Sequence, residues 1–139
     1  MHIFKFLIGY LFFLSFLLSK DNIQFSANIL ESIIENDIEK RIFKDNVIVK
    51  KGSMLLYADE ATYVPSLGQV MLKNNVEMID FKDSLSCEYL TLYDQNNKKF
   101  NAGGNVQFYK QNSIIKCNIL NYLESISGDT LNIDLYKNA

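Results

Sequence analysis

Apolar and polar side chains alternate along most of this chain in short runs, and polar turns separate the runs. Alternation of this kind is typical of β-strands that bury one face. The pattern also repeats. An asparagine-valine pair recurs at spacings of 29 and 30 residues, as Asn46-Val47, Asn75-Val76 and Asn105-Val106. A period of this length is typical of stacked units, none of which can bury its own apolar face.

Each repeat predicts two strands joined by a polar turn. The expected strand pairs are 42–49 with 54–63, 70–78 with 85–93, and 100–108 with 114–122. Clusters of turn-forming residues at 64–68 and 94–98 separate the repeats. The prediction is an all-β domain of successive antiparallel strand pairs with a ~30-residue repeat.

One irregularity recurs in all three repeats. Side chains of a strand alternate between its faces, so residues that share a face lie an even number of positions apart. Counted from each valine, apolar residues fall at offsets 9 and 11 and then at 14 and 16, so the step from 11 to 14 is odd. This shift predicts a bend or bulge beside Asp59, Glu88 and Asn118, and a sheet that folds over at that level.

The two ends fit the repeat only in part. Residues 27–34 match the second half of a repeat, which favours a strand, but their apolar side chains also fall at helical spacing. Residues 128–133 match a last unit that stops short, and atypical ends are expected of stacked repeats.

The N-terminus carries an apolar run of 13 residues from Phe6 to Leu18, preceded by Lys5. A membrane-spanning helix needs about 20 apolar residues, whereas a signal-peptide core needs roughly 7–15. The run therefore favours a signal peptide over residues 1–19, ahead of a β-domain over residues 20–139. An uncleaved membrane anchor is the alternative, because Ser19 offers only a poor cleavage site. Either interpretation predicts export.

Charge and residue types exclude most chemistry. Without residues 1–19 the chain has 16 acidic side chains against 13 basic ones, and no basic stripe that would follow a nucleic-acid backbone. Its one histidine, His2, lies in the predicted targeting segment. Asp59 and Glu88 share a repeat position, which suggests either a catalytic carboxylate pair or, as we favour, a polar corner. We expect no enzymatic activity, no cofactor and no metal site.

Two cysteines, Cys87 and Cys117, occupy one repeat position, where the first repeat has Ala58. If the two were cross-strand neighbours, an exported protein would be able to oxidise them to a disulfide. Packing as small apolar side chains is the other interpretation, and the one we favour.

Three segments carry a resemblance to a known family. They are FKDNVIVKKGSMLLYADEATY (43–63), NNVEMIDFKDSLSCEYLTLYD (74–94) and AGGNVQFYKQNSIIKCNILNY (102–122). All three share Gly/Asp/Asn-Asn-Val, a polar turn, and Ala-Asp, Cys-Glu or Cys-Asn ahead of a second apolar strand. They resemble the OstA-like repeat of the lipopolysaccharide-transport proteins LptA and LptC. The resemblance covers about residues 27–135.

The resemblance implies an open β-jellyroll, folded like a taco, which shields lipopolysaccharide acyl chains without catalysis. Such domains join edge to edge into a periplasmic bridge between the two membranes, so the implied partners are lipopolysaccharide, other Lpt-type jellyroll proteins and further copies of this chain, head to tail. Both a soluble role like that of LptA and an anchored role like that of LptC fit the sequence. By offset, the implied lipid-binding lining consists of Val49, Leu56, Ala58, Tyr63, Met78, Leu85, Cys87, Leu92, Phe108, Ile115, Cys117 and Tyr122.

A second hypothesis is an envelope assembly module that uses the same sheet only to pair with proteins. It predicts a fully packed interior, whereas the lipid-carrying hypothesis predicts an apolar groove that admits an acyl chain. A remote third, a carbohydrate-acting enzyme, would need two carboxylates facing one cleft.

Overall fold

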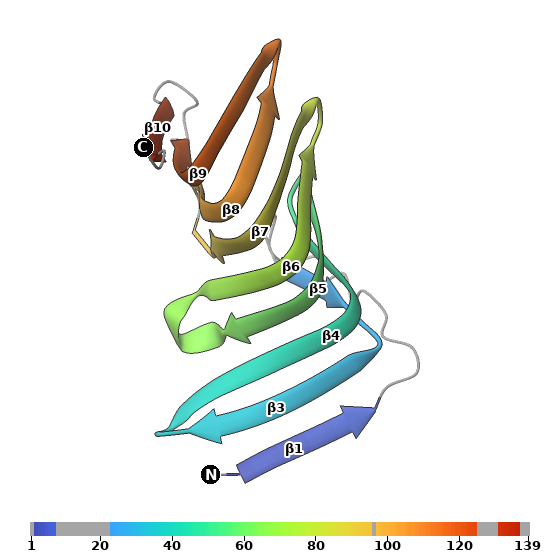
Figure 1. Cartoon of the computed structure of the whole chain (residues 1–139). Helices are drawn as coiled ribbons and strands as arrows, with labels where there is room; N and C mark the ends of the chain where they lie inside the picture. Colours follow the sequence, from blue (N-terminus) through green and yellow to red (C-terminus); the bar gives the residue numbers. More distant parts are fainter. Residues whose placement is uncertain (1, 8–22, 96, 125–130, 137–139) are drawn as a thin grey trace.

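The structure is a computed structural model of the 139-residue chain, and it describes residues 2–7, 23–95, 97–124 and 131–136. These residues form one antiparallel sheet, so the predicted all-β fold is confirmed (Figure 1). Within these ranges, a single 3₁₀ turn, η1 (Pro65–Leu67), links two of the strands. The strands are β1 (His2–Leu7), β2 (Ile23–Ser26), β3 (Ile29–Glu35), β4 (Ile38–Lys51), β5 (Met54–Val64), β6 (Gln69–Asp80), β7 (Asp83–Tyr93), β8 (Lys98–Lys110), β9 (Ser113–Glu124) and β10 (Leu131–Tyr136).

The strands lie in the order β1-β3-β4-β5-β6-β7-β8-β9-β10, and β2 pairs with the second half of β4. From β3 onward the order follows the chain, because each predicted strand pair is a hairpin and each hairpin pairs with the next. The first and last strands do not meet, so the sheet is open, as a jellyroll of the taco kind requires (Figure 1). Residues 29–35 form a strand, so the helical interpretation of 27–34 is wrong.

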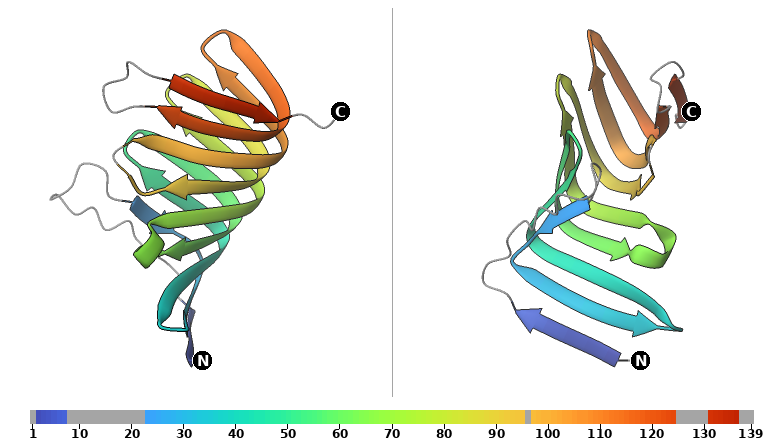
Figure 2. Two further views of the ribbon diagram at one scale, coloured as in Figure 1. Left: turned by 90° about the vertical axis from the view of Figure 1, so that its left-hand side faces the viewer. Right: turned by 180° about the vertical axis from the view of Figure 1, so that it is seen from behind.

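The long strands are bent, and their bends divide the sheet into two arms (Figure 2). We name the strand halves next to the tight turns at 52–53, 81–82 and 111–112 the tip arm; it comprises residues 47–58, 76–87 and 106–117. The other halves form the base arm, which comprises residues 38–44, 60–73, 89–103 and 119–124. The arms share one inner face at the bend and diverge from it, so the sheet folds over as predicted.

The bend lies where each strand pair from β4 to β9 shifts register: between Lys44 and Val47, Lys73 and Val76, and Gly103 and Val106, for example. The predicted irregularity at 58–61, 87–90 and 117–120 is present. Ala58 and Ala61 are both buried although they lie an odd number of positions apart, and the other repeats show the same step. The sequence nevertheless did not predict the part of the corner that lies on β4, β6 and β8. The left-handed backbone belongs to the asparagine-valine strands, at Asp45-Asn46, Asn74-Asn75 and Gly104-Asn105.

Residue types explain this location. Asparagine, aspartate and glycine adopt positive φ at the lowest cost, so two of them in succession allow a strand to turn sharply. The asparagine side chains also bind the neighbouring strand. Asn75 Nδ2 donates to Asp59 Oδ2 (2.9 Å) and Asn105 Nδ2 donates to Glu88 Oε1 (3.3 Å). The asparagine-valine pair is therefore the corner of each repeat.

The inner faces of the two arms pack against each other to form the core. Phe100 stacks on Tyr122 with ring centroids 4.9 Å apart, and Phe108 meets Tyr122 edge to face at 5.6 Å. At the other end of the sheet, Phe25 of β2 stacks on Phe43 of β4 at 4.5 Å. Apolar side chains from all three repeats thus form one continuous cluster.

The predicted targeting segment falls only partly within the structure. His2–Leu7 pairs along β3 as β1, and residues 8–19 lie outside the described residues. Among the described residues, no helix is long and apolar enough to cross a membrane. At the other end, β10 pairs with β9 where a short last unit was expected, and residues 128–130 of that unit lie outside the described part.

Candidate functional site

All twelve residues of the predicted lining lie on the inner face of the folded sheet. Ten of them are buried, and the other two, Tyr63 and Ile115, are partly buried and pack against the core. Side chains from the two arms fill the space between them, and residues such as Leu56, Met78 and Phe108 have no exposed surface. The interior is therefore packed, and an acyl chain would enter it only if the arms moved apart.

The prediction left out inner-face residues of the base arm. Val70 and Leu72 of β6 and Phe100 and Ala102 of β8 are fully or almost fully buried in the same cluster. Alternation within their own strands would have found them, because they lie an even number of positions from one another. The offset count missed them because it began at the valine and ran only toward the C-terminus.

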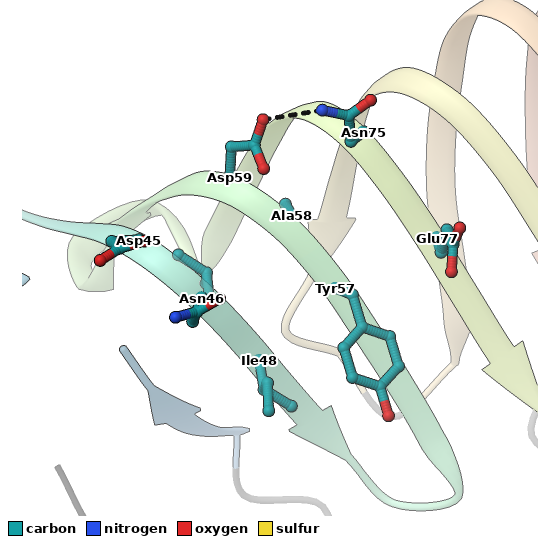
Figure 3. A pocket seen from close by; sticks show the side chains of 9 residues that line it. Asp45, Asn46, Ile48, Tyr57, Ala58, Asp59, Asn75 and Glu77 are labelled. Carbon is teal, nitrogen blue, oxygen red and sulfur yellow. Dashed lines mark hydrogen bonds between the residues drawn. The ribbon is translucent and has the colours of Figure 1, made fainter. Parts of the chain in front are cut away.

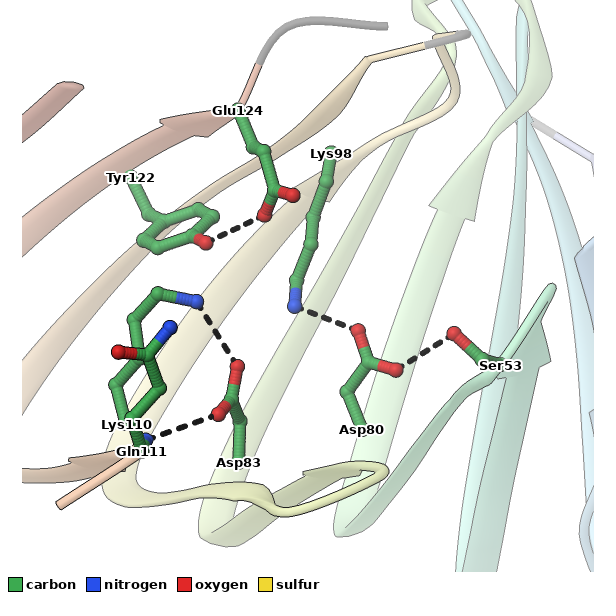
Figure 4. Close-up of polar contacts among 8 residues, drawn as sticks. All are labelled: Ser53, Asp80, Asp83, Lys98, Lys110, Gln111, Tyr122 and Glu124. Atoms are coloured by element: carbon green, nitrogen blue, oxygen red, sulfur yellow. Dashed lines mark hydrogen bonds and ion pairs between the residues drawn. The ribbon is translucent and has the colours of Figure 1, made fainter. Parts of the chain in front are cut away.

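The inner face changes from apolar to polar at the free ends of the arms. Continuing the inward alternation from Val49, Met78, Leu85 and Phe108 leads to Lys51, Asp80, Asp83 and Lys110 on the tip arm. Lys98 and Glu124 hold the corresponding end positions on the base arm. We name these six residues the polar mouth; most of them line a cavity of about 480 Å³ (Figure 4).

Polar contacts at the mouth are short and partly buried. Lys98 Nζ lies 2.6 Å from Asp80 Oδ2, and Ser53 Oγ donates to Asp80 Oδ1 at 2.6 Å (Figure 4). Lys110 Nζ lies 3.0 Å from Asp83 Oδ2. Among the described residues, no buried side-chain nitrogen or oxygen lacks a hydrogen-bond partner. The mouth is thus electrostatically satisfied without any ligand.

Ionisation at the mouth follows these contacts. Burial alone would raise the pKa of the Asp80 carboxyl, but the hydrogen bonds from Lys98 and Ser53 and the charges of Lys98 and Lys110 outweigh it and lower the pKa. Burial likewise opposes the charged form of Lys110, and its contacts with Tyr122 and Asp83 outweigh burial and raise the pKa. Both groups are therefore held in their charged forms.

Tyr122 links the polar mouth to the core. Its hydroxyl donates to Glu124 Oε2 at 2.6 Å, while Lys98 Nζ and Lys110 Nζ lie 5.3 Å and 5.4 Å from its ring centroid. Burial, together with the hydrogen bond to Glu124, raises the pKa of Tyr122 to about 12. Its ring packs in the core and its hydroxyl belongs to the mouth.

The convex side of the corner carries Asp59 and Glu88, the two carboxylates that share a repeat position. A cavity of about 380 Å³ is lined there by Asp45, Tyr57, Asp59 and Glu77 among others (Figure 3). Asp59 accepts its hydrogen bond from Asn75, and Glu88 accepts one from Asn105 in a separate, smaller depression. Each carboxylate thus binds the asparagine side chain at the corner of the neighbouring strand.

Cys87 and Cys117 are not neighbours, contrary to the cross-strand arrangement considered from the sequence. Cys87 pairs with Val76 and Cys117 with Val106, so β8 separates the two cysteines and no disulfide joins them. Equivalent positions of successive hairpins lie two strands apart, about 9.5 Å, which exceeds the reach of a disulfide. Burial raises the pKa of the Cys87 thiol to about 12.

Within the described part of the chain, no three His, Cys, Asp or Glu side chains gather in a way that would hold a metal ion.

Comparison with known proteins gives no assignment: no protein-family model matches this chain, and no curated protein matches it significantly.

Proposed function

We propose that this chain is an exported lipid carrier of the lipopolysaccharide-transport kind, a non-enzymatic module that passes lipid from the inner to the outer membrane. The observation that carries the proposal is the apolar inner face, which runs without interruption through all three repeats between the two arms. Acyl chains need such a surface, because each methylene removed from water is worth about 0.8 kcal/mol. The OstA-like motifs and the predicted export support the same function.

The open sheet supports the partners that the resemblance implies. A sheet whose two ends do not meet offers edge strands to neighbouring proteins, and strand addition would align the inner faces of successive domains. The proposed partners are lipopolysaccharide, bound by its acyl chains, and other jellyroll modules or copies of this chain joined at the edges.

Photo-crosslinking from two adjacent residues tests the proposal. Phe108 points into the core and is fully buried, whereas the next residue, Tyr109, is 40% exposed on the outer face. We expect p-benzoylphenylalanine in place of Phe108 to form adducts with added lipopolysaccharide, and the same group in place of Tyr109 to form far fewer. Aromatic replacement avoids the buried charge that would unfold the domain. Equal yields at both positions, or no adduct at either, would contradict the proposal.

The packed interior favours a second candidate function, because a protein-pairing module of the envelope requires no cavity. That function predicts protein adducts from the edge strand β10, for example from a crosslinker at Asp134, and no lipid adduct from position 108. Both candidates allow protein adducts at the edge, so the lipid adduct from position 108 is the result that separates them.

A further inference from the structure

Contacts at the polar mouth join the two arms across the opening of the fold. Lys51 is buried at the end of the tip arm, and its Nζ donates to the carbonyl oxygens of Tyr93 (3.1 Å) and Gln95 (2.6 Å). Those carbonyls lie 42 and 44 residues away, where the base arm turns between β7 and β8. These two hydrogen bonds form the first bridge between the arms, and this bridge is independent of strand pairing.

A second bridge lies beside it. Lys98, at the start of β8 in the base arm, reaches Asp80 at the end of β6 in the tip arm. Ser53, in the neighbouring hairpin turn, fixes the other oxygen of the same carboxylate. Asp80 is only 8% exposed, so the pair lies over the core and is largely shielded from solvent. Screening by salt is weak for such a pair.

The third bridge runs through Tyr122. Lys110 of the tip arm is held by Asp83 and lies over the ring of Tyr122 on the base arm, whose hydroxyl binds Glu124. A cation over an aromatic face is attracted most strongly where water is excluded. The three bridges therefore span the opening from β4 to β9.

We propose that these three bridges form a releasable clasp, which holds the arms closed over the packed interior and must open before an acyl chain can enter. The inference rests on the proposed lipid-carrying function. Two features carry it. The interior has no room for a chain while the arms are closed. Among the described residues, the shared corner and apolar packing that an incoming acyl chain would replace also join the arms.

The clasp is built from polar contacts, which water can replace when the arms part. The core beneath it is apolar and would remain covered by the entering chain. Charged side chains in such positions would be costly without partners, so the closed state is well defined rather than loosely collapsed. Opening thus replaces the polar contacts of the clasp by hydrogen bonds to water, and the packing between the arms by packing against the acyl chain.

A reversible lock tests the clasp. Asp80→Cys and Lys98→Cys are introduced into a Cys87→Ala, Cys117→Ala background, since Ala58 already fills that position in the first repeat. 1,2-Ethanediyl bismethanethiosulfonate then ties the two arms together, and dithiothreitol releases them. Lipid entry is read as the lipopolysaccharide adduct formed from p-benzoylphenylalanine at position 108. The matched control is Ile79→Cys with Ser84→Cys, a directly paired couple on the outer face of the tip arm alone.

We expect the lock to reduce adduct formation about tenfold or more and dithiothreitol to restore it, while the control pair changes little. Separately, Lys98→Met, which keeps the length of the side chain without its charge, should accelerate loading. Equal loading of locked and released protein would overturn the clasp and leave the lipid-carrying function intact. Absence of any adduct even in the released protein would overturn the lipid-carrying function, and the clasp as a gate with it.

Discussion

At the scale of single residues, the corner depends on side chains that tolerate left-handed backbone. Asn75 has φ of 54° and also donates a hydrogen bond to Asp59. We expect Asn75→Ala to lower the free energy of unfolding by about 2 kcal/mol, of which 1–2 kcal/mol comes from the backbone. Asn75→Gly removes the same hydrogen bond but accepts the backbone, so it should cost less. Urea unfolding compares the two; equal losses would show that the backbone conformation does not matter.

Two adjacent glycines make a sharper residue-scale comparison. A Cβ at Gly103 would fall on the ring atoms of Tyr89, whose side chain is half exposed and able to swing away. A Cβ at Gly104 would lie against the Cβ of Glu88, which cannot swing away. Gly104 also has φ of 79°, in the left-handed region that favours glycine. Gly103→Ala should therefore cost less than about 1 kcal/mol and Gly104→Ala clearly more. Thermal unfolding of the two variants measures this, and the reverse order would contradict the corner geometry.

The buried carboxylate of Asp80 predicts a pH dependence. Its contacts with Lys98, Ser53 and Lys110 lower its pKa in the folded state, so the unfolded state binds more protons in acid. The stabilisation is therefore present above the ordinary carboxyl pKa and is lost as the pH falls through the lower, folded value. We expect wild type to be more stable than Asp80→Asn at pH 7, and the difference to shrink below about pH 4. A difference that is constant from pH 7 to pH 3 would contradict this.

At the scale of elements, each strand pair is a hairpin, and this determines what equivalent positions can do. Because β8 separates Cys87 from Cys117, oxidation should form no disulfide between them. Both are buried, and the raised pKa of Cys87 keeps it protonated at neutral pH. We expect a mass unchanged by mild oxidant, and thiol labelling that is slow until the protein unfolds. A loss of two hydrogens in the native protein would contradict the strand order.

Strands and inner face were predictable because alternation is a local property. Offsets counted from Val47, Val76 and Val106 placed all twelve residues of the predicted lining on the inner face. The left-handed pairs at the corner were not predicted, because alternation carries no information about φ. The sequence placed Lys51 and Lys110 in the turns between strands, because their sequence neighbours form turns. Their partners at the mouth lie on other hairpins, which local alternation does not show.

At the scale of the whole molecule, strand pairing joins only sequence neighbours from β3 to β10, as in other stacked repeats. Each internal hairpin therefore has the same surroundings as the next, apart from the bridges of the mouth. This arrangement predicts that one full repeat can be removed. Deleting residues 74–103 joins Lys73 to Gly104, two equivalent sides of the corner, and lets the first half of β6 continue into the second half of β8.

We expect the shortened chain to fold into a smaller antiparallel sheet, because every remaining strand still finds an equivalent partner. Its free energy of unfolding should fall, since the deletion removes Asp80, Asp83 and Lys98 along with part of the core, and its urea m-value should fall with the surface buried. Circular dichroism and urea unfolding measure both. A matched deletion displaced by half a repeat, residues 60–88, joins Asp59 of β5 to Tyr89 of β7, keeps the corner residues in phase and should fold equally well. Loss of cooperative unfolding in the first deletion would mean that contacts across the mouth, rather than neighbouring hairpins, determine the fold.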